Sequence, residues 1–226
     1  MLRAENWQLT DNGMRPLLLG HRGARASRHI PENTLESFEL CLDHGCDGFE
    51  FDVRRSLDGA ALICHDAIFG GAEIEGTAAE DLALPALEDV LRRFAGRAFL
   101  DIELKAVGVE AALIALLRKY PPLRGYVVSS FLPEVLTACH SLEGGIPLGF
   151  LCDRRNALAR WRELPVEWAI PHVDLVDREL VEGVHAARKR IMVWTVNGVA
   201  EIRRLAEWGV DAIISDETER LVDSVR

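Results

Sequence analysis

The chain has 226 residues, of which 49% are hydrophobic, so it can bury a full core and shows no composition typical of disorder. Its formal net charge of −10 argues against a nucleic-acid partner or an anionic membrane surface, because both attract positively charged faces. An anionic small molecule stays compatible with this charge, because it needs only a local cluster of basic groups.

Targeting and cysteine signals are weak. Residues 1–15 form a lead segment without the apolar stretch of a secretory signal, and no apolar run approaches the ~20 residues of a membrane span. The five cysteines are scattered without a C-x-x-C pair, which favours free thiols over a disulfide framework or a zinc site. We therefore expect a soluble cytoplasmic protein without membrane insertion; the sequence assigns no oligomeric state.

The first part of the chain predicts a strand, a helix and a hairpin. The apolar run "PLLLG" at 16–20 predicts a strand, and "PENTLESFELCLDHG" at 31–45 a helix that Asn33 or Thr34 could cap. "GFEFDVRR" at 48–55 alternates apolar and polar residues and predicts a strand. "DG" at 58–59 is a hairpin-turn signal that leads to a return strand at 60–64, and residues 67–84 have no clear period and are expected to be a loop.

Strands and helices alternate along the rest of the chain. Strands are expected at 98–105, 126–131, 146–152, 167–171, 191–197 and 210–215, and helices at 85–96, 108–120, 132–142, 156–163, 177–189, 199–209 and 217–225. With the return strand set aside, about eight strands alternate with helices, which predicts an α/β fold. We expect a single (β/α)8 TIM barrel over 16–226 with a short hairpin extension after the second strand; an open doubly wound sheet is the alternative.

Charged side chains gather where the predicted strands end, which is where the active site of such a barrel lies. Glu50 and Asp52 share one face of their strand, and Glu103 ends the next barrel strand. Three carboxylates together are costly unless they are paired or hold a cation. Because all-oxygen ligation suits a hard divalent ion, the pattern predicts a site for Mg²⁺ or Ca²⁺.

Basic side chains and histidines follow the same strand ends. Arg22 and Lys105 could hold an anionic group, and a guanidinium matches phosphate geometry well. Histidine is the residue type best suited to exchange protons at neutral pH, so His21 and His65 could act as proton carriers. A metal, two cations and two proton carriers together point to cleavage of a phosphoester.

The ordered set "GHRG…PENTLESF…GFEFDV…HD…DIELK…SSF…VWTVN…GVDAIISD" closely resembles the glycerophosphodiester phosphodiesterase family from Gly20 almost to the C-terminus. The resemblance implies hydrolysis of a small glycerophosphodiester to an alcohol and sn-glycerol 3-phosphate, with a cyclic 1,2-phosphate intermediate often proposed. It implies these roles: metal ligands Glu50, Asp52 and Glu103; acid/base residues His21 (proton acceptor) and His65 (donor); and substrate contacts or their supports Arg22, Glu32, Asn33, Lys105, Phe131 and Trp194.

The sequence also departs from the family pattern. The segment after His65-Asp66 is short, and the loop between "HRG" and "PENT" is basic, with Arg25 and Arg28 expected to be plain surface charges or recruiters of an anionic substrate. Cys64 alternates with His65 along the strand, so we expect it to be a core thiol and not a nucleophile.

Other functions compete with this interpretation. The same machinery could act on lysophospholipids, as a lysophospholipase D does, although no amphipathic docking helix is evident. Lys105 could form a Schiff base in an aldolase-type barrel, but the nearby carboxylates favour its charged form. A non-catalytic barrel that binds glycerol phosphates is the remaining alternative, and such a protein is expected to have lost a metal carboxylate or a histidine.

Overall fold

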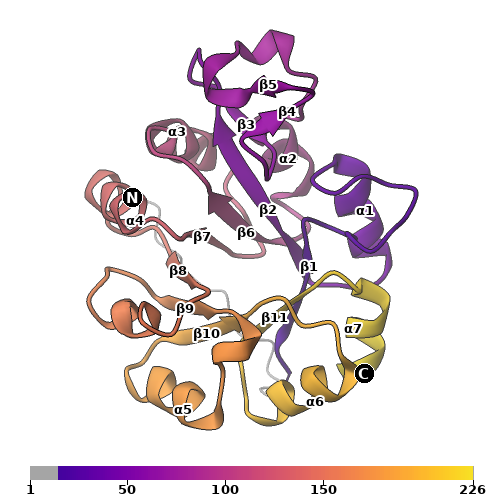
Figure 1. The fold of residues 1–226 in the computed structure, drawn as a ribbon, viewed down its shortest axis with the longest axis vertical. Helices are drawn as coiled ribbons and strands as arrows, with labels where there is room; N and C mark the ends of the chain where they lie inside the picture. The colour runs from indigo at the N-terminus through magenta and orange to yellow at the C-terminus, as the bar shows by residue number, and fades with distance from the viewer. Residues whose placement is uncertain (1–14, 226) are drawn as a thin grey trace.

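The computed structural model describes residues 15–225, so most of the predicted lead segment lies outside the described residues. Eight parallel strands form a closed barrel, because the first strand pairs with both the second and the last (Figure 1). The (β/α)8 prediction is confirmed, and the open doubly wound sheet is wrong. The barrel strands are β1 (Leu17–His21), β2 (Gly48–Arg55), β6 (Phe99–Leu104), β7 (Tyr126–Ser130), β8 (Leu148–Cys152), β9 (Trp168–Pro171), β10 (Arg190–Val193) and β11 (Ala212–Ser215).

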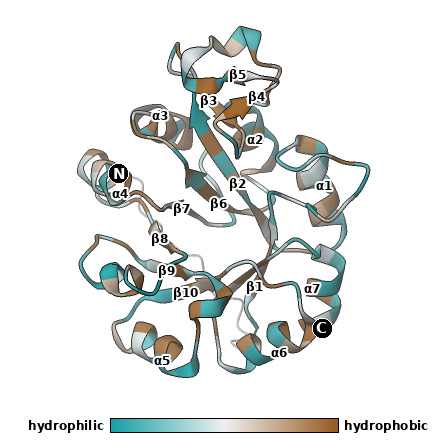
Figure 2. Cartoon of the chain, viewed as in Figure 1, coloured by the Kyte–Doolittle hydropathy of each residue, from teal (hydrophilic) through white to brown (hydrophobic). Residues whose placement is uncertain are grey.

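Helices surround the barrel on its outside (Figure 1). Thr34 caps the first of them by accepting a hydrogen bond from the Ser37 amide, which decides between the two predicted caps. Figure 2 shows teal and brown residues along these helices, as expected where one side packs on the sheet and the other meets water. The helices are α1 (Leu35–Asp43), α2 (Leu87–Phe94), α3 (Glu110–Lys119), α4 (Pro133–Leu142), α5 (Arg178–Ala186), α6 (Val199–Glu207) and α7 (Thr218–Val225).

The alternation along β2 sorts its side chains between two environments. Phe49 stacks on Phe38 of α1 with ring centroids 4.3 Å apart, and its edge meets Phe94 of α2 at 5.2 Å. These rings belong to the core between the sheet and the helices. Because side chains alternate along a strand, Glu50 and Asp52 must point into the barrel.

The barrel interior is filled below the carboxylates. Apolar side chains from alternate positions of the strands form a separate buried cluster there, so the barrel is a packed core and not a channel. Phe131 and Trp194 pack on this cluster. Its buried members are Leu17, Leu19, Phe99, Val127, Leu151, Trp168, Ile170, Met192, Ala212 and Ile214.

The segment expected to be a loop at 67–84 has structure of its own. After β3 (Ala61–Ile63), which runs antiparallel to β2, the strands β4 (Ile68–Phe69) and β5 (Ala72–Glu73) pair as a small hairpin that projects at the top of Figure 1. Gly70 and Gly71 join them with φ values of 60° and 87°, the positive pair that a two-residue hairpin turn needs. The expectation was wrong because two-residue strands are too short to show a period.

Short 3₁₀ turns account for other differences. Two of them, Ile74–Gly76 and Ala79–Asp81, follow β5, and a third, Val173–Leu175, follows β9. The helix expected at 156–163 is a 3₁₀ helix, Leu158–Arg162, which buries Trp161.

The regular strand expected at 191–197 ends at Val193. Beyond it only isolated contacts with the neighbouring strands continue, a bridge from Trp194 to His172 and a hydrogen bond from the Val196 amide to the Ile214 carbonyl, and Oδ1 of Asn197 accepts from the Asp216 amide. All five cysteines are free, and the described residues contain no helix that is long and apolar enough to cross a membrane.

Candidate active site

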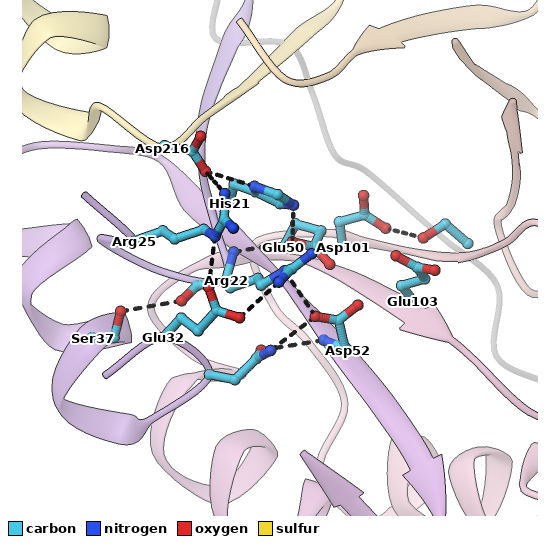
Figure 3. Close-up of polar contacts among 12 residues, drawn as sticks. His21, Arg22, Arg25, Glu32, Ser37, Glu50, Asp52, Asp101, Glu103 and Asp216 are labelled. Atoms are coloured by element: carbon cyan, nitrogen blue, oxygen red, sulfur yellow. Dashed lines mark hydrogen bonds and ion pairs between the residues drawn. The ribbon is translucent and has the colours of Figure 1, made fainter. Parts of the chain in front are cut away.

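Three carboxylates meet at the C-terminal end of the barrel. Glu50 and Asp52 come from β2, and Glu103 comes from β6, where the parallel register sets it opposite Asp52. One oxygen of each lies within 4.8 Å of the others, and all three side chains are buried. Figure 3 shows the group facing into the barrel. The predicted juxtaposition is therefore present.

Cations compensate this cluster only in part. The ammonium of Lys105 lies 2.7 Å from Oε1 of Glu103 and 3.3 Å from Oδ1 of Asp52, and Nε of Arg22 lies 3.2 Å from Oδ2 of Asp52. Burial works to raise the pKa of Asp52, but Lys105 and Arg22 outweigh it and hold that pKa below its usual value. For Glu50 and Glu103, burial and then the Asp52 charge raise the pKa, that of Glu103 to about 8.

The donor set fits a divalent cation. Oε1 of Glu50 is buried without a hydrogen-bond partner, and Oδ1 of Asp52, also without a hydrogen bond, has the Lys105 ammonium 3.3 Å away, so both oxygens have unused capacity to bind an ion. Two carboxylates whose pKa values are raised by burial and by a like charge gain most from such an ion, because it favours their ionised form. Oxygen-only ligation suits Mg²⁺ or Ca²⁺.

Both predicted histidines line the same pocket, and each has one ring nitrogen tied to a carboxylate. Nδ1 of His21 lies 2.7 Å from Oδ1 of Asp216, while its Nε2 lies 3.9 Å from Oε2 of Glu50. Nδ1 of His65 lies 2.7 Å from Oδ1 of the exposed Asp66. In each case the hydrogen bond at Nδ1 leaves Nε2 as the nitrogen that can exchange a proton in the pocket.

The turn after β1 orients Arg22. Arg22 has a φ of 55°, and its amide donates to Oε2 of Glu50 at 3.0 Å. Gly23, with a φ of 81°, lies so close to α1 that a Cβ there would sit 2.4 Å from Oγ of Ser37. Only glycine fits this approach, so the turn that presents Arg22 requires it.

Glu32 and Asn33 support pocket residues from behind. Glu32 accepts a hydrogen bond from Nη1 of Arg22 at 2.6 Å, and Nδ2 of Asn33 donates to Oδ2 of Asp52 at 2.8 Å. Neither side chain lines the pocket. Glu32 thus holds the arginine proposed to bind phosphate and Asn33 holds a carboxylate of the cluster, whereas neither contacts His21 directly; a role in substrate binding stays a prediction.

Two aromatic rings, Phe131 and Trp194, form an aromatic wall of the pocket. Phe131 and Trp194 meet edge to face with ring centroids 5.5 Å apart, and the ammonium of Lys105 lies 5.8 Å from the centroid of Phe131. Nε1 of Trp194 donates to the Ile170 carbonyl at 3.0 Å, so the indole is fixed while its ring faces the pocket. Trp194 is thus both barrel packing and pocket wall.

The pocket has a volume of about 130 Å³, enough for a small polar group. Eight of the ten lining residues were predicted from the sequence as site residues. The other two, Leu151 and Ile214, form an apolar part of the lining that sequence reasoning missed. It also missed Asp101, a fully buried carboxyl whose pKa burial raises to about 7, although its alternation with Glu103 along β6 was a usable signal. The lining residues are His21, Arg22, Glu50, His65, Glu103, Lys105, Phe131, Leu151, Trp194 and Ile214.

Two other predictions on individual side chains can be compared with the structure. Cys64 packs partly buried against the small cluster under β3 and does not line the pocket, and burial is the main cause that raises its pKa. Burial works to lower the pKa of Lys105, but Glu103 and Asp52 outweigh it and raise that pKa. A raised pKa favours the charged ammonium, whereas the Schiff-base alternative needs a neutral amine.

A closed barrel with three clustered carboxylates, two histidines and two basic groups at its C-terminal end is the arrangement expected of a barrel that cleaves phosphodiesters. The model of the "Glycerophosphoryl diester phosphodiesterase family" matches residues 21–88 and 70–220. The chain belongs to this family, and so it is an enzyme of the glycerophosphodiester phosphodiesterase class.

Individual relatives agree with this assignment. A "Glycerophosphodiester phosphodiesterase" of Caldanaerobacter subterraneus is 26% identical over 242 residues, which cover 94% of this chain and 99% of the relative. A putative glycerophosphoryl diester phosphodiesterase from Silicibacter pomeroyi has a TM-score of 0.84 at 23% identity, covering 94% of this chain and 93% of the other. A phosphodiesterase from Oleispira antarctica has a TM-score of 0.82 at 25% identity, covering 93% and 97%.

Proposed function

We propose that the chain hydrolyses small glycerophosphodiesters to an alcohol and sn-glycerol 3-phosphate, with a divalent cation held by Glu50, Asp52 and Glu103. The observation that carries this proposal is the convergence of Glu50, Glu103, the two histidines and the two cations on one pocket, with an oxygen of Asp52 within 4.8 Å of both carboxylates. The Oleispira antarctica structure is described as a complex with the product sn-glycerol-3-phosphate, which supports the same product here.

In this proposal the cations of the chain bind the phosphate. Arg22 presents its guanidinium from the turn after β1, and Lys105 presents its ammonium from the end of β6. Their positive charge stabilises the negative charge that develops on the phosphate oxygens. A bound Mg²⁺ or Ca²⁺ would add charge stabilisation at the same phosphate. Phe131 and Trp194 offer apolar faces to the carbon atoms of the glycerol.

The histidines move the protons. Nε2 of His21 accepts the proton of the glycerol 2-hydroxyl as its oxygen forms a new bond to phosphorus. The bond between phosphorus and the oxygen of the leaving alcohol breaks, and Nε2 of His65 protonates that oxygen. Water then opens the cyclic phosphate with the two roles reversed, which returns both histidines to their starting states.

The experiment that tests this function measures release of glycerol 3-phosphate from glycerophosphoethanolamine. One sample is loaded with Mg²⁺, one with Ca²⁺, and one is treated with EDTA and then resupplied with metal. We expect release that EDTA removes and metal restores. If neither Mg²⁺ nor Ca²⁺ supports release of glycerol 3-phosphate, the proposed reaction is contradicted. If EDTA leaves the release unchanged, the proposed dependence on a divalent cation is contradicted.

A lysophospholipid is a second candidate substrate, and one observation favours it. Ile68 and Phe69, just after His65 in the chain, leave 62% and 40% of their surface exposed on the hairpin extension. Apolar side chains in such a position could contact an acyl chain. Lysophosphatidylethanolamine is therefore assayed in parallel, and a faster rate with it than with glycerophosphoethanolamine would favour this candidate.

A further inference from the structure

One guanidinium links two carboxylates that lie behind the pocket. Nε of Arg25 donates to Oε2 of Glu32 at 2.6 Å, and its Nη1 donates to Oδ1 of Asp216 at 3.0 Å (Figure 3). Each carboxylate in turn holds a pocket residue: Oε1 of Glu32 accepts from Arg22, and Oδ1 of Asp216 is the partner of His21. Arg25 therefore joins the support of the phosphate-binding arginine to the support of the first histidine.

We propose that Arg25 is a positioning residue, which keeps His21 and Arg22 in a fixed relative arrangement through Asp216 and Glu32. This inference deepens the proposed function, because it rests on the roles proposed for His21 and Arg22. It gives Arg25 a role other than the two that the sequence offered for it, a plain surface charge or a recruiter of an anionic substrate.

The loop that carries Arg25 is itself anchored at both sides of the bridge. The amide of Ala26 donates to the Asp216 carbonyl at 3.1 Å, and the amide of Ala24 donates to the Ser37 carbonyl of α1 at 3.1 Å. Asn197 donates to the second carboxylate oxygen of Asp216 at 2.8 Å. Asp216 is thus held from three directions, and its orientation fixes the imidazole ring that it contacts.

The bridge acts on geometry more than on folding energy. Arg25 is 39% exposed at its side chain, and exposed ion pairs contribute little to stability. A guanidinium, however, offers two donors at a fixed separation, which a lysine ammonium cannot. A misplacement of about 1 Å in a catalytic group can cost on the order of 10²-fold in rate, so a small loss of order here has a measurable effect.

The competing explanation is that Arg25 only attracts an anionic substrate. Arg28 is the matched control, because it lies exposed in the same loop and has no ion pair or hydrogen bond within residues 15–225. Arg25→Ala and Arg28→Ala remove the same charge from the same loop. If attraction is the only role, both variants raise KM and neither changes kcat.

The experiment measures kcat and KM for glycerophosphoethanolamine in Arg25→Ala, Arg25→Lys and Arg28→Ala. We expect Arg25→Ala to lower kcat about tenfold, which is within the cost of misplacing a catalytic group. Arg28→Ala should keep kcat, and Arg25→Lys should recover only part of the loss. An Arg25→Ala enzyme with unchanged kcat, or complete recovery in Arg25→Lys, would overturn the proposal.

A second readout is independent of turnover. The Nδ1 proton of His21, in its hydrogen bond to Asp216, is followed by proton NMR and assigned by its absence in His21→Gln. We expect Arg25→Ala to shift or broaden this resonance and Arg28→Ala to leave it unchanged; an unchanged resonance in Arg25→Ala would overturn the proposal. If the wild type releases no glycerol 3-phosphate but Arg25→Ala still shifts the resonance, the proposed function fails and the link from Arg25 to His21 stands.

Discussion

Nδ1 of His21 and Oδ1 of Asp216 lie 2.7 Å apart although 195 positions separate them in the chain. The contact exists because β1 and β11 pair directly where the barrel closes. His65 instead takes its carboxylate partner from the next residue, Asp66, which is largely exposed. The two histidines therefore have the same local geometry in different surroundings: one dyad is half-buried in the barrel end, and the other is at its rim.

The first prediction concerns these histidines. His21→Gln and His65→Gln should each lower kcat by roughly 10²–10⁴, the range of a general acid or base, with intact folding by circular dichroism. His140→Gln is the control, because His140 is exposed on α4, away from the pocket. A variant of either pocket histidine that retains the wild-type kcat would remove that residue from the proposed proton transfer.

The second prediction concerns the carboxylate cluster. Glu50→Gln, Asp52→Asn and Glu103→Gln should each weaken metal binding at least about 100-fold, the upper end of what outer-shell partners cost. Calorimetric titration with Mg²⁺ and Ca²⁺ measures this directly, without relying on turnover. Asp153→Asn is the control, because Asp153 is half-exposed after β8 and does not line the pocket. If a variant of one cluster residue binds the metal as tightly as the wild type does, that residue is not a metal ligand.

The third prediction concerns the aromatic wall. Phe131→Ala and Trp194→Leu remove faces that the proposed function places against the glycerol carbons, so we expect KM to rise several-fold, in line with the roughly 1–2 kcal/mol of a partly buried ring. The inhibition constant of glycerol 3-phosphate should rise in parallel, while that of inorganic phosphate should not. A parallel loss of phosphate affinity would show that the rings support Lys105 instead.

The strand-borne part of this site follows from the alternation of residues in the sequence, whereas the loop residues Glu32 and Asn33 were indicated only by the resemblance to a family, and the role of Arg25 was not predicted at all. Glu50 and Asp52 alternate with phenylalanines, and the rule that barrel strands point their C-terminal ends at one site brings Glu103 beside them. The bridge from Arg25 to Asp216 spans 191 positions and depends on the path of an irregular loop, for which no periodicity exists. The hairpin at Gly70-Gly71 lies between these cases, because its turn signal was present but its strands were too short to detect.

The fourth prediction concerns Cys64, the neighbour of His65. The structure packs this thiol against the small cluster under β3, and burial raises its pKa, so it is a poor nucleophile at neutral pH. Cys64→Ser should keep kcat and KM within about twofold, the small effect expected of a conservative change outside a catalytic unit. A Cys64→Ser enzyme whose kcat falls by about tenfold or more while its fold is intact by circular dichroism would contradict this expectation.

The fifth prediction concerns the dependence of stability on pH. Burial works to raise the pKa of Asp216, but hydrogen bonds from His21, Asn197 and Arg25 outweigh it and hold that pKa well below its ordinary value of 3.8. A carboxyl whose pKa is depressed in the folded state contributes stability that is present above its unfolded pKa and is lost as the pH falls toward the folded value.

Asp216→Asn should therefore unfold more easily than the wild type at pH 5, by roughly 1–3 kcal/mol if it loses a charge-assisted hydrogen bond. The difference should shrink at pH 3, because the wild-type advantage declines below the ordinary pKa of 3.8. Urea unfolding of both proteins at pH 5 and pH 3 measures the two differences. Asp153→Asn, which changes a half-exposed carboxylate, should show little difference at either pH. A stability gap for Asp216→Asn that widens as the pH falls would mean that the Asp216 carboxylate is not stabilised by its three partners in the folded protein.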